Sequence, residues 1–169
     1  KYKIDNIEIV TAFDVDKRKV NHTFKQAMIS EPNCTPLFVD IKDLPDGPIV
    51  KMGPVLDGIA PHMESYSKNE SFRVSSQESV NVKQELFDKK VDILINYLPV
   101  GSQQATEFYA NCCLETGVSF LNCIPVFIAS NPVWDKKFFD ANIPMIGDDM
   151  KSQFGASIIS QMLQELALS

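Results

Sequence analysis

The sequence predicts an α/β protein with one open, mostly parallel sheet flanked by helices. Apolar runs of strand length alternate along the chain with segments whose apolar residues recur at helical spacing. Such alternation is typical of parallel βαβ units joined by right-handed crossovers. The chain has 169 residues, of which 44% are hydrophobic and 22% charged. This composition indicates a folded globular protein and excludes a disordered or collagen-like chain.

The first predicted βα unit is a strand over residues 7–13 followed by a helix over 17–29. The strand reads IEIVTAF, which is rich in β-branched and aromatic residues. In the helix, apolar side chains recur every three or four positions from Val20 to Met28. A second strand is predicted over residues 36–41, after Pro32 has closed the first unit.

The middle of the chain is less regular. Residues 43–61 contain four prolines and three glycines and are predicted to form a loop. Residues 65–79 are polar and serine-rich, which is typical of an exposed connector. A helix is predicted over residues 80–89, with Val82, Leu86 and Phe87 on its apolar face.

The second half of the chain has the clearest alternation. Residues 91–97 read VDILINY, an almost continuous apolar run that predicts a central strand covered on both faces. The next helix is predicted to begin at Ser102 and to end at Gly117, the residue type expected just past a helix C-terminus. The remaining predicted elements are strands over 118–122 and 143–146 and helices over 133–141 and 152–167.

Charge and cysteine content narrow the function classes. Sixteen Lys and Arg against 22 Asp and Glu give a net charge of −6, which disfavours binding to nucleic acid or to anionic membranes. No apolar stretch approaches the roughly 18 residues of a membrane span. The cysteines form no CxxC pair, so we expect reduced, buried thiols, a cytoplasmic location and no metal ligands; they are Cys34, Cys112, Cys113 and Cys123.

Polar residues follow several predicted strands where each one ends. They are Asp14, Asp16, Asn96, Asn122, Asp148 and Asp149. Ligands of open parallel sheets bind beyond the carboxyl ends of the strands, but turns and helix caps also place polar residues there. The 169 residues contain neither GxGxxG nor GxxxxGK[ST]. We therefore expect either a protein that binds no dinucleotide or a fragment that lacks the glycine-rich loop.

Two further segments contain candidate site residues. GDDMKS, residues 147–152, places two carboxylates and Lys151 between a strand and a helix N-terminus. A lysine there stabilises negative charge that develops on a substrate oxygen, although a capped helix with a surface ion pair is an equally good interpretation. Asp57, in GPVLDG, is interpreted as a turn residue in preference to a ligand contact.

Four longer segments resemble one family in the same order along the chain. They are AFDVDKRKV (12–20), NYLPVGSQQATEFYA (96–110), FLNCIPVFIAS (120–130) and GDDMKSQFGAS (147–157). Together they resemble the myo-inositol-1-phosphate synthases, in their shorter archaeal and bacterial form. The similarity is weakest between residues 36 and 89, where GPVLDG (53–58) stands out.

The resemblance implies an NAD-binding Rossmann-like domain, of which residues 1–150 would be part. Residues 151–169 would form a helix that leads into a second domain for substrate binding and tetramer formation. The implied isomerase reaction converts D-glucose 6-phosphate to 1L-myo-inositol 1-phosphate for inositol and phospholipid biosynthesis. It proceeds by oxidation at C5 by NAD, enolisation, aldol closure between C6 and C1, and reduction. A divalent cation is a further cofactor that the resemblance raises.

The resemblance also assigns roles to individual residues. Lys151 and Asp149 would be catalytic, with Lys151 stabilising the alkoxide or enolate. The cofactor-binding residues would be Asp14, on the adenosine ribose, and Asn96, Tyr97, Leu98, Pro99, Asn122, Cys123, Asp148 and Ser152. Two alternatives stay open. One is a related synthase acting on another sugar phosphate, and the other is an inactive Rossmann fragment that binds a nucleotide or a partner chain.

Overall fold

The computed structural model describes residues 3, 6–31, 40–149, 162 and 165–166. The chain divides into two compact units. Unit 1 comprises Lys1–Val55 and Ile59–Val91, and unit 2 comprises Leu56–Gly58 and Asp92–Ser169. Each unit has a parallel sheet with helices, so the predicted α/β class is confirmed. The predicted single sheet is a pair of separate sheets, with two and three strands.

The sheet of unit 1 pairs β1 (Phe13–Asp14) with β2 (Lys51–Met52). The two strands are parallel, with Phe13 opposite Lys51 and Asp14 opposite Met52. Between them lie α1 (Phe24–Ile29) and the 3₁₀ helix η2 (Ile41–Asp43). The connection therefore follows the βαβ pattern that the alternation predicted.

Unit 1 continues with the 3₁₀ helix η3 (Pro61–Ser65) and with α2 (Val82–Asp88). The Asn81 side chain caps α2 by accepting a hydrogen bond from the Gln84 N–H. Val82 and Leu86 are buried as predicted, whereas Phe87 is exposed. Only the face of α2 that carries Val82 and Leu86 therefore contributes to the core.

The first βα unit is shorter than predicted. Strand structure begins at Phe13, and residues 7–12 belong to no strand, although the Ala12 carbonyl oxygen accepts from the Lys51 N–H. The helix begins at Phe24 and not at residue 17, because local hydrogen bonds favour turns before it. The Asp16 carboxylate accepts from the Arg18 N–H, and Thr23 and Gln26 then form a capping box.

The irregular middle of unit 1 holds more structure than predicted. The expected loop over 43–61 contains the two-residue strand β2. Prolines and glycines flank this strand, so the sequence pattern did not predict it. The expected exposed connector over 65–79 buries Ser71 completely. Ile41 belongs to η2 and not to a strand, and residues 36–39 of that predicted strand lie outside the described residues.

The sheet of unit 2 contains three parallel strands in the order β3-β4-β5. They are β3 (Ile93–Asn96), β4 (Ser119–Asn122) and β5 (Met145–Ile146). They are joined by α3 (Gln103–Thr116) and α4 (Pro132–Asp140). These elements confirm the predicted alternation in the second half of the chain. Of the predicted helix over 152–167, only residues 162, 165 and 166 are described, and they are helical.

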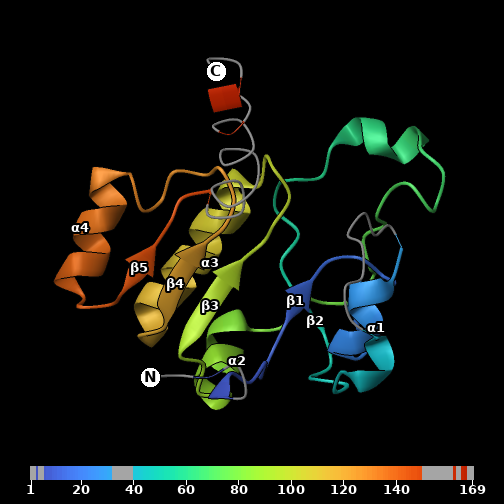
Figure 1. Ribbon diagram of the computed structural model, residues 1–169, viewed down its shortest axis with the longest axis horizontal. Coiled ribbons are helices and arrows are strands. Elements are labelled where there is room, and N and C mark those ends of the chain that lie inside the picture. Colours follow the sequence, from blue (N-terminus) through green and yellow to red (C-terminus); the bar gives the residue numbers. More distant parts are fainter. Residues whose placement is uncertain (1–2, 4–5, 32–39, 150–161, 163–164, 167–169) are drawn as a thin grey trace. The chain divides into compact units, whose positions relative to one another are not determined.

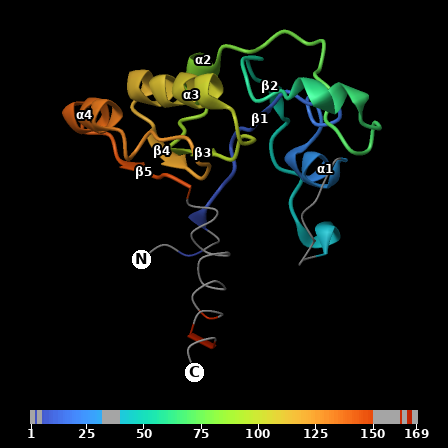
Figure 2. The same ribbon diagram turned by 90° about the horizontal axis from the view of Figure 1, so that it is seen from above.

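One face of this sheet is covered by α3, as Figures 1 and 2 show. Phe120 of β4 is buried and stacks on Phe138 of α4, with ring centroids 6.4 Å apart. β3 lies at the edge of the sheet, and its side chains Ile93 and Ile95 are 57% and 50% exposed. The prediction of a central strand covered on both faces is therefore wrong. An apolar run does not reveal which strand is central, and the face of β3 that carries Ile93 and Ile95 is largely exposed.

The predicted ends of α3 are confirmed. Gly117 follows the last helical residue with a φ of +75°, a conformation that glycine adopts without strain. Ser102 precedes the first helical residue, but its side chain makes no capping hydrogen bond. The N-terminus of α3 is capped instead by Asp57, which belongs to unit 2 although it comes before β3 in the sequence.

No helix in the described part of the chain is long and apolar enough to cross a membrane.

Candidate functional site

The carboxyl ends of the three strands in unit 2 are joined by one hydrogen-bond network. Asn96 and Asn122 end β3 and β4 and lie opposite each other in register. The Asn96 Nδ2 donates to the Asn122 Oδ1 at 2.9 Å, and the Asn122 Nδ2 donates to the Asp148 Oδ1 at 2.7 Å. Thr106 of α3 and Ser130 extend this edge network at its two ends. Parallel strands place their carboxyl ends at one edge, which explains why these distant residues meet.

The two asparagines of the edge network are buried and satisfied. Asn96 and Asn122 are 4% and 0% exposed. The Asn96 Oδ1 accepts from the Leu98 N–H at 3.1 Å, and the Asn122 Nδ2 also donates to the Val126 carbonyl oxygen at 2.6 Å. The two side chains therefore hold the loops that follow β3 and β4. Because they are buried, they are not themselves open to a ligand.

Asp148 holds the loop at residues 128–130. Its carboxylate accepts from the N–H groups of Ile128, Ala129 and Ser130 at 3.0 to 3.1 Å, and from the Ser130 hydroxyl at 2.7 Å. Burial raises the pKa of Asp148, but the hydrogen bonds from Ser130, Asn122 and Ala129 outweigh burial and lower it overall. The carboxylate is therefore charged at neutral pH and is saturated with donors.

More accessible candidates surround the edge network. Tyr97 and Pro99 are exposed and Leu98 is half-buried, in the loop between β3 and α3. A hydrogen bond with the buried Cys123 raises the pKa of the Tyr97 phenol, and burial adds to the increase. Asp149 is half-buried, has a φ of +58°, and donates its N–H to the Ile124 carbonyl oxygen at 3.1 Å. Lys151 and Ser152 lie outside the described residues.

Two acids at the end of β1 in unit 1 have different surroundings. The Asp14 side chain is 31% exposed, with its Oδ2 3.3 Å from the Lys19 Nζ. Its Oδ1 accepts from the N–H groups of Val15 and Asp16. The Asp16 side chain is 1% exposed and pairs with the Arg18 guanidinium at 2.7 Å. Asp14 is therefore the acid at this strand end that a ligand hydroxyl is able to reach.

Asp16 stabilises the turn after β1. Its carboxylate accepts from the backbone N–H and the Nε of Arg18 and from the Arg73 N–H. Burial raises the pKa of Asp16, and the hydrogen bonds and charge of Arg18 lower it by more. Arg18 in turn donates to the carbonyl oxygens of Lys68 and Ser71. The ion pair thus fixes the serine-rich segment to the turn.

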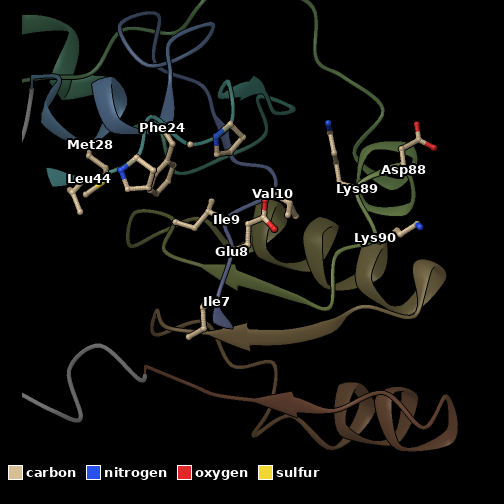
Figure 3. A pocket seen from close by; sticks show the side chains of 13 residues that line it. Ile7, Glu8, Ile9, Val10, Phe24, Met28, Leu44, Asp88, Lys89 and Lys90 are labelled. Atoms are coloured by element: carbon tan, nitrogen blue, oxygen red, sulfur yellow. The ribbon is translucent and has the colours of Figure 1, made fainter. Parts of the chain in front are cut away.

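The larger hollow of unit 1 contains none of the predicted site residues. It has a volume of about 770 Å³ and an apolar lining that includes Phe24, Met28 and Leu44. Figure 3 shows these three side chains grouped on one side, with Asp88 and Lys89 from the end of α2 on another. A smaller hollow of about 150 Å³ is lined in part by Asp14 and Lys19. Of these two hollows, the smaller one contains a predicted binding residue, Asp14.

Sequence reasoning missed three residues that build the site. Thr106 links Asn96 to the Ser102 carbonyl oxygen, and Ser130 donates twice to Asp148. Asp57 was interpreted as a turn residue, yet it accepts from the Gln104 and Ala105 N–H groups. Thr106 and Ser130 lie inside the segments 96–110 and 120–130 that resemble the synthase family, and this resemblance was the available signal.

Within residues 6–31 and 40–149, no group of three or more His, Cys, Asp or Glu side chains is placed to hold a metal ion. The cysteines described in unit 2 are buried thiols that are not in disulfides; they are Cys112, Cys113 and Cys123.

Comparisons with known proteins identify relatives of the chain. No family model matches it. It is 44% identical over 165 residues to the inositol-3-phosphate synthase of Mycobacterium tuberculosis H37Rv, which covers 98% of this chain and 43% of that protein. It is 45% identical over 166 residues to the Corynebacterium glutamicum inositol-3-phosphate synthase, covering 98% and 44%. The chain thus spans less than half the length of these relatives.

Two solved structures are similar. The crystal structure of Ari2 matches with a TM-score of 0.71 and 33% identity, over 93% of this chain and 43% of that one. A myo-inositol-1-phosphate synthase-related protein from Thermotoga maritima matches with a TM-score of 0.57 and 19% identity, over 86% and 43%. The second match supports the fold alone.

The fold and the polar strand ends define an open-sheet α/β protein whose carboxyl edges carry the candidate site. Within this class, the chain is related over 98% of its length to the inositol-3-phosphate synthases. The resemblance indicated by its four motifs is therefore confirmed.

Proposed function

We propose that the protein acts in inositol phosphate synthesis, as an isomerase that converts D-glucose 6-phosphate to 1L-myo-inositol 1-phosphate. The observation that carries this proposal is the 44% identity to a protein named inositol-3-phosphate synthase, which extends over 98% of the chain. That stretch includes GDDMKS, in which the proposed catalytic residues Asp149 and Lys151 lie. The edge network supports the same site, because it anchors Asp148 immediately before Asp149.

The described residues fit NAD as the cofactor of this reaction. Asp14 is a half-exposed carboxylate at the carboxyl end of β1, a position suited to accept hydrogen bonds from ribose hydroxyls. Tyr97, Leu98 and Pro99 form a partly exposed loop at the end of β3 that would contact the cofactor. Four further predicted residues are buried or already saturated with hydrogen bonds, so they would hold this loop and its neighbours in place. They are Asn96, Asn122, Cys123 and Asp148.

When bound, NAD would supply hydride removal from the substrate and its later return, so the reaction has no net redox change. The Lys151 ammonium would stabilise negative charge on the substrate oxygen during enolisation and ring closure. Asp149 would exchange a proton with the substrate, and Ser152 would contact the cofactor. The low pKa of Asp148 keeps a fixed negative charge next to this segment.

The remaining parts of the proposal concern the whole protein. Residues 1–150 would form part of the NAD-binding domain, and residues 151–169 would lead into a domain for substrate binding and tetramer formation. A divalent cation would be an additional cofactor. The thiols of Cys112, Cys113 and Cys123 are buried and not in disulfides, which supports a cytoplasmic location, where thiols stay reduced.

A product assay tests this function. The protein is incubated with glucose 6-phosphate and NAD, and inositol 1-phosphate is followed by phosphorus NMR. We expect product formation, and a loss of about 100-fold in the rate for Lys151→Ala, because a fixed charge at a developing oxyanion is worth that much. Lys136→Ala is the control, since Lys136 pairs with Asp140 on the exposed surface of α4. Absence of product, or equal rates for both variants, would contradict the proposal.

A further inference from the structure

The N-terminus of α3 receives its capping carboxylate from far away in the sequence. Asp57 accepts from the Gln104 N–H at 2.6 Å and from the Ala105 N–H at 3.0 Å. Gln104 lies 47 residues after Asp57. The helix has no acidic residue in its own first turn, and the N-cap residue Ser102 makes no side-chain capping bond. Asp57 is therefore the group that compensates the unpaired N–H groups and the positive end of the helix dipole.

A second observation places the same segment tightly against α3. Gly58 has a φ of +79°, and a Cβ atom at this position would lie 2.1 Å from the Ser102 Oγ and 3.2 Å from the Ser102 Cβ. The positive φ favours glycine, and a Cβ atom would also require the Ser102 hydroxyl to move. Leu56–Gly58 is correspondingly part of unit 2, although the residues on both sides of it belong to unit 1.

The N-terminus of α3 is also one end of the loop over residues 97–101. The Ser102 N–H donates to the Pro99 carbonyl oxygen at 3.2 Å. At the other end of the loop, the Leu98 N–H donates to the Asn96 Oδ1. Thr106 connects the two ends, because its hydroxyl donates to the Ser102 carbonyl oxygen and accepts from Asn96. The position of this loop therefore depends on where the first turn of α3 lies.

We propose that Asp57 is a positioning residue for the loop over 97–101. It holds Gly58 against Ser102 and thereby fixes the first turn of α3. The loop over 97–101 ends at this turn, so its position is fixed as well. The proposal deepens the proposed function and rests on it where cofactor binding is concerned, since Tyr97, Leu98 and Pro99 are proposed cofactor contacts. It differs from both sequence interpretations of Asp57, because the residue is neither a ligand contact nor only part of a turn.

A simple helix cap is the competing explanation, and the two roles are separable. Gln104 is exposed in the first turn of α3, so Gln104→Glu supplies a negative charge to the helix end from within the helix. That change compensates the helix dipole but does not attach Leu56–Gly58 to the first turn of α3. If Asp57 only caps, Gln104→Glu repairs all effects of Asp57→Ala. If Asp57 positions the loop, the substitution repairs thermal stability alone.

The test is backbone amide hydrogen exchange, measured by NMR on the whole chain. We expect Asp57→Ala to lower the Tm and to accelerate exchange of the Leu98 and Ser102 amides at least tenfold. In Asp57→Ala/Gln104→Glu we expect the Tm to rise again while both amides stay fast. The amides of Ala129 and Ser130, which donate to Asp148, should exchange at the original rate in both variants. Asp135→Ala, which removes the first-turn acid of α4, is the matched control and should leave Leu98 unchanged.

The proposal would be overturned if the Leu98 and Ser102 amides exchanged at their original rates in Asp57→Ala. It would also be overturned if Gln104→Glu restored those rates fully in the double variant. If Asp57→Ala fails to fold, Asp57→Asn replaces it, because an asparagine keeps one of the two acceptor oxygens and should accelerate the same amides to a smaller degree. An NAD titration adds a second readout, with at least tenfold weaker binding expected in both Asp57→Ala variants. If the unmodified protein binds no NAD, the proposed function fails, and the amide exchange still decides the role of Asp57.

Discussion

The strand ends of unit 1 and unit 2 each carry a saturated acid, but the two acids are stabilised by different means. Asp16 is held by the guanidinium of Arg18, a full opposite charge at 2.7 Å. Asp148 is held by an asparagine amide, three backbone N–H groups and a hydroxyl. In each unit a second, partly exposed acid lies within two positions, Asp14 or Asp149. The comparison shows that an ion pair in unit 1 and neutral donors in unit 2 each stabilise a carboxylate at a strand end.

The largest effect should come from Asp148→Ala. The substitution leaves the N–H groups of residues 128–130 and the Asn122 amide without their acceptor, and each unsatisfied buried donor is costly. We expect the free energy of unfolding to fall by about 3 kcal/mol, measured by urea denaturation. A loss below about 1 kcal/mol would show that these donors find other partners.

Asp16→Asn should have a smaller effect. Arg18 keeps its hydrogen bonds to the carbonyl oxygens of Lys68 and Ser71, so its guanidinium stays partly compensated. We expect a loss of about 2 kcal/mol in the same measurement. Because this pair is ionic, 1 M salt should reduce the difference in unfolding free energy between Asp16→Asn and the unmodified protein. The same salt should leave the loss caused by Asp148→Ala almost unchanged. An equal salt dependence of the two losses would contradict the conclusion that Asp16 is stabilised by an ion pair and Asp148 by neutral donors.

Acid should remove the contributions of both carboxylates. The folded-state pKa values of Asp16 and Asp148 lie below the ordinary value of 3.8. A lowered pKa contributes stability that is fully present above the unfolded-state pKa and is lost as the pH falls through the folded-state pKa. The unfolding free energy should therefore drop steeply below about pH 4, with a shallower slope in Asp16→Asn and Asp148→Asn. Urea midpoints between pH 6 and pH 2.5 measure these slopes, and unchanged slopes in the variants would contradict the assignment.

The smallest effect on stability should be that of Asp14→Asn. Its partner Lys19 is 3.3 Å away, and both side chains are about one third exposed, at 31% and 29%. The asparagine also keeps an oxygen for the Val15 and Asp16 N–H groups. We expect a change below about 1 kcal/mol in the unfolding free energy. A larger loss would mean that Asp14, like Asp16, is a structural acid.

The elements of unit 2 were predictable because local chemistry determines them. Gly117 ends α3 in a conformation that glycine favours, and the strand patterns on either side of α3 are unbroken. The meeting of Asn96, Asn122 and Asp148 also follows from parallel topology, since each lies at the end of a strand or just after it. These parts of the site needed no information beyond the strand pattern.

Other parts depend on contacts between distant residues, which no local pattern contains. β2 forms between a proline and a glycine because β1 provides its partner. Ile93 and Ile95 are apolar but exposed, since they share the open face of β3. The role of Asp57 depends on a helix that starts 46 positions after it, at Gln103. The residues next to Asp57 in the sequence therefore could not reveal its role.

The central proposal is that Asp14 accepts hydrogen bonds from the ribose hydroxyls of a bound NAD molecule. The most direct measurement is a calorimetric titration of NAD into the unmodified protein, into Asp14→Asn and into the control Asp46→Asn. Asp46 also faces a lysine, but it is 77% exposed and is not a predicted site residue. The account predicts saturable binding that Asp14→Asn weakens at least tenfold and Asp46→Asn leaves unchanged. Absence of binding to the unmodified protein, or equal affinity in Asp14→Asn, would contradict it.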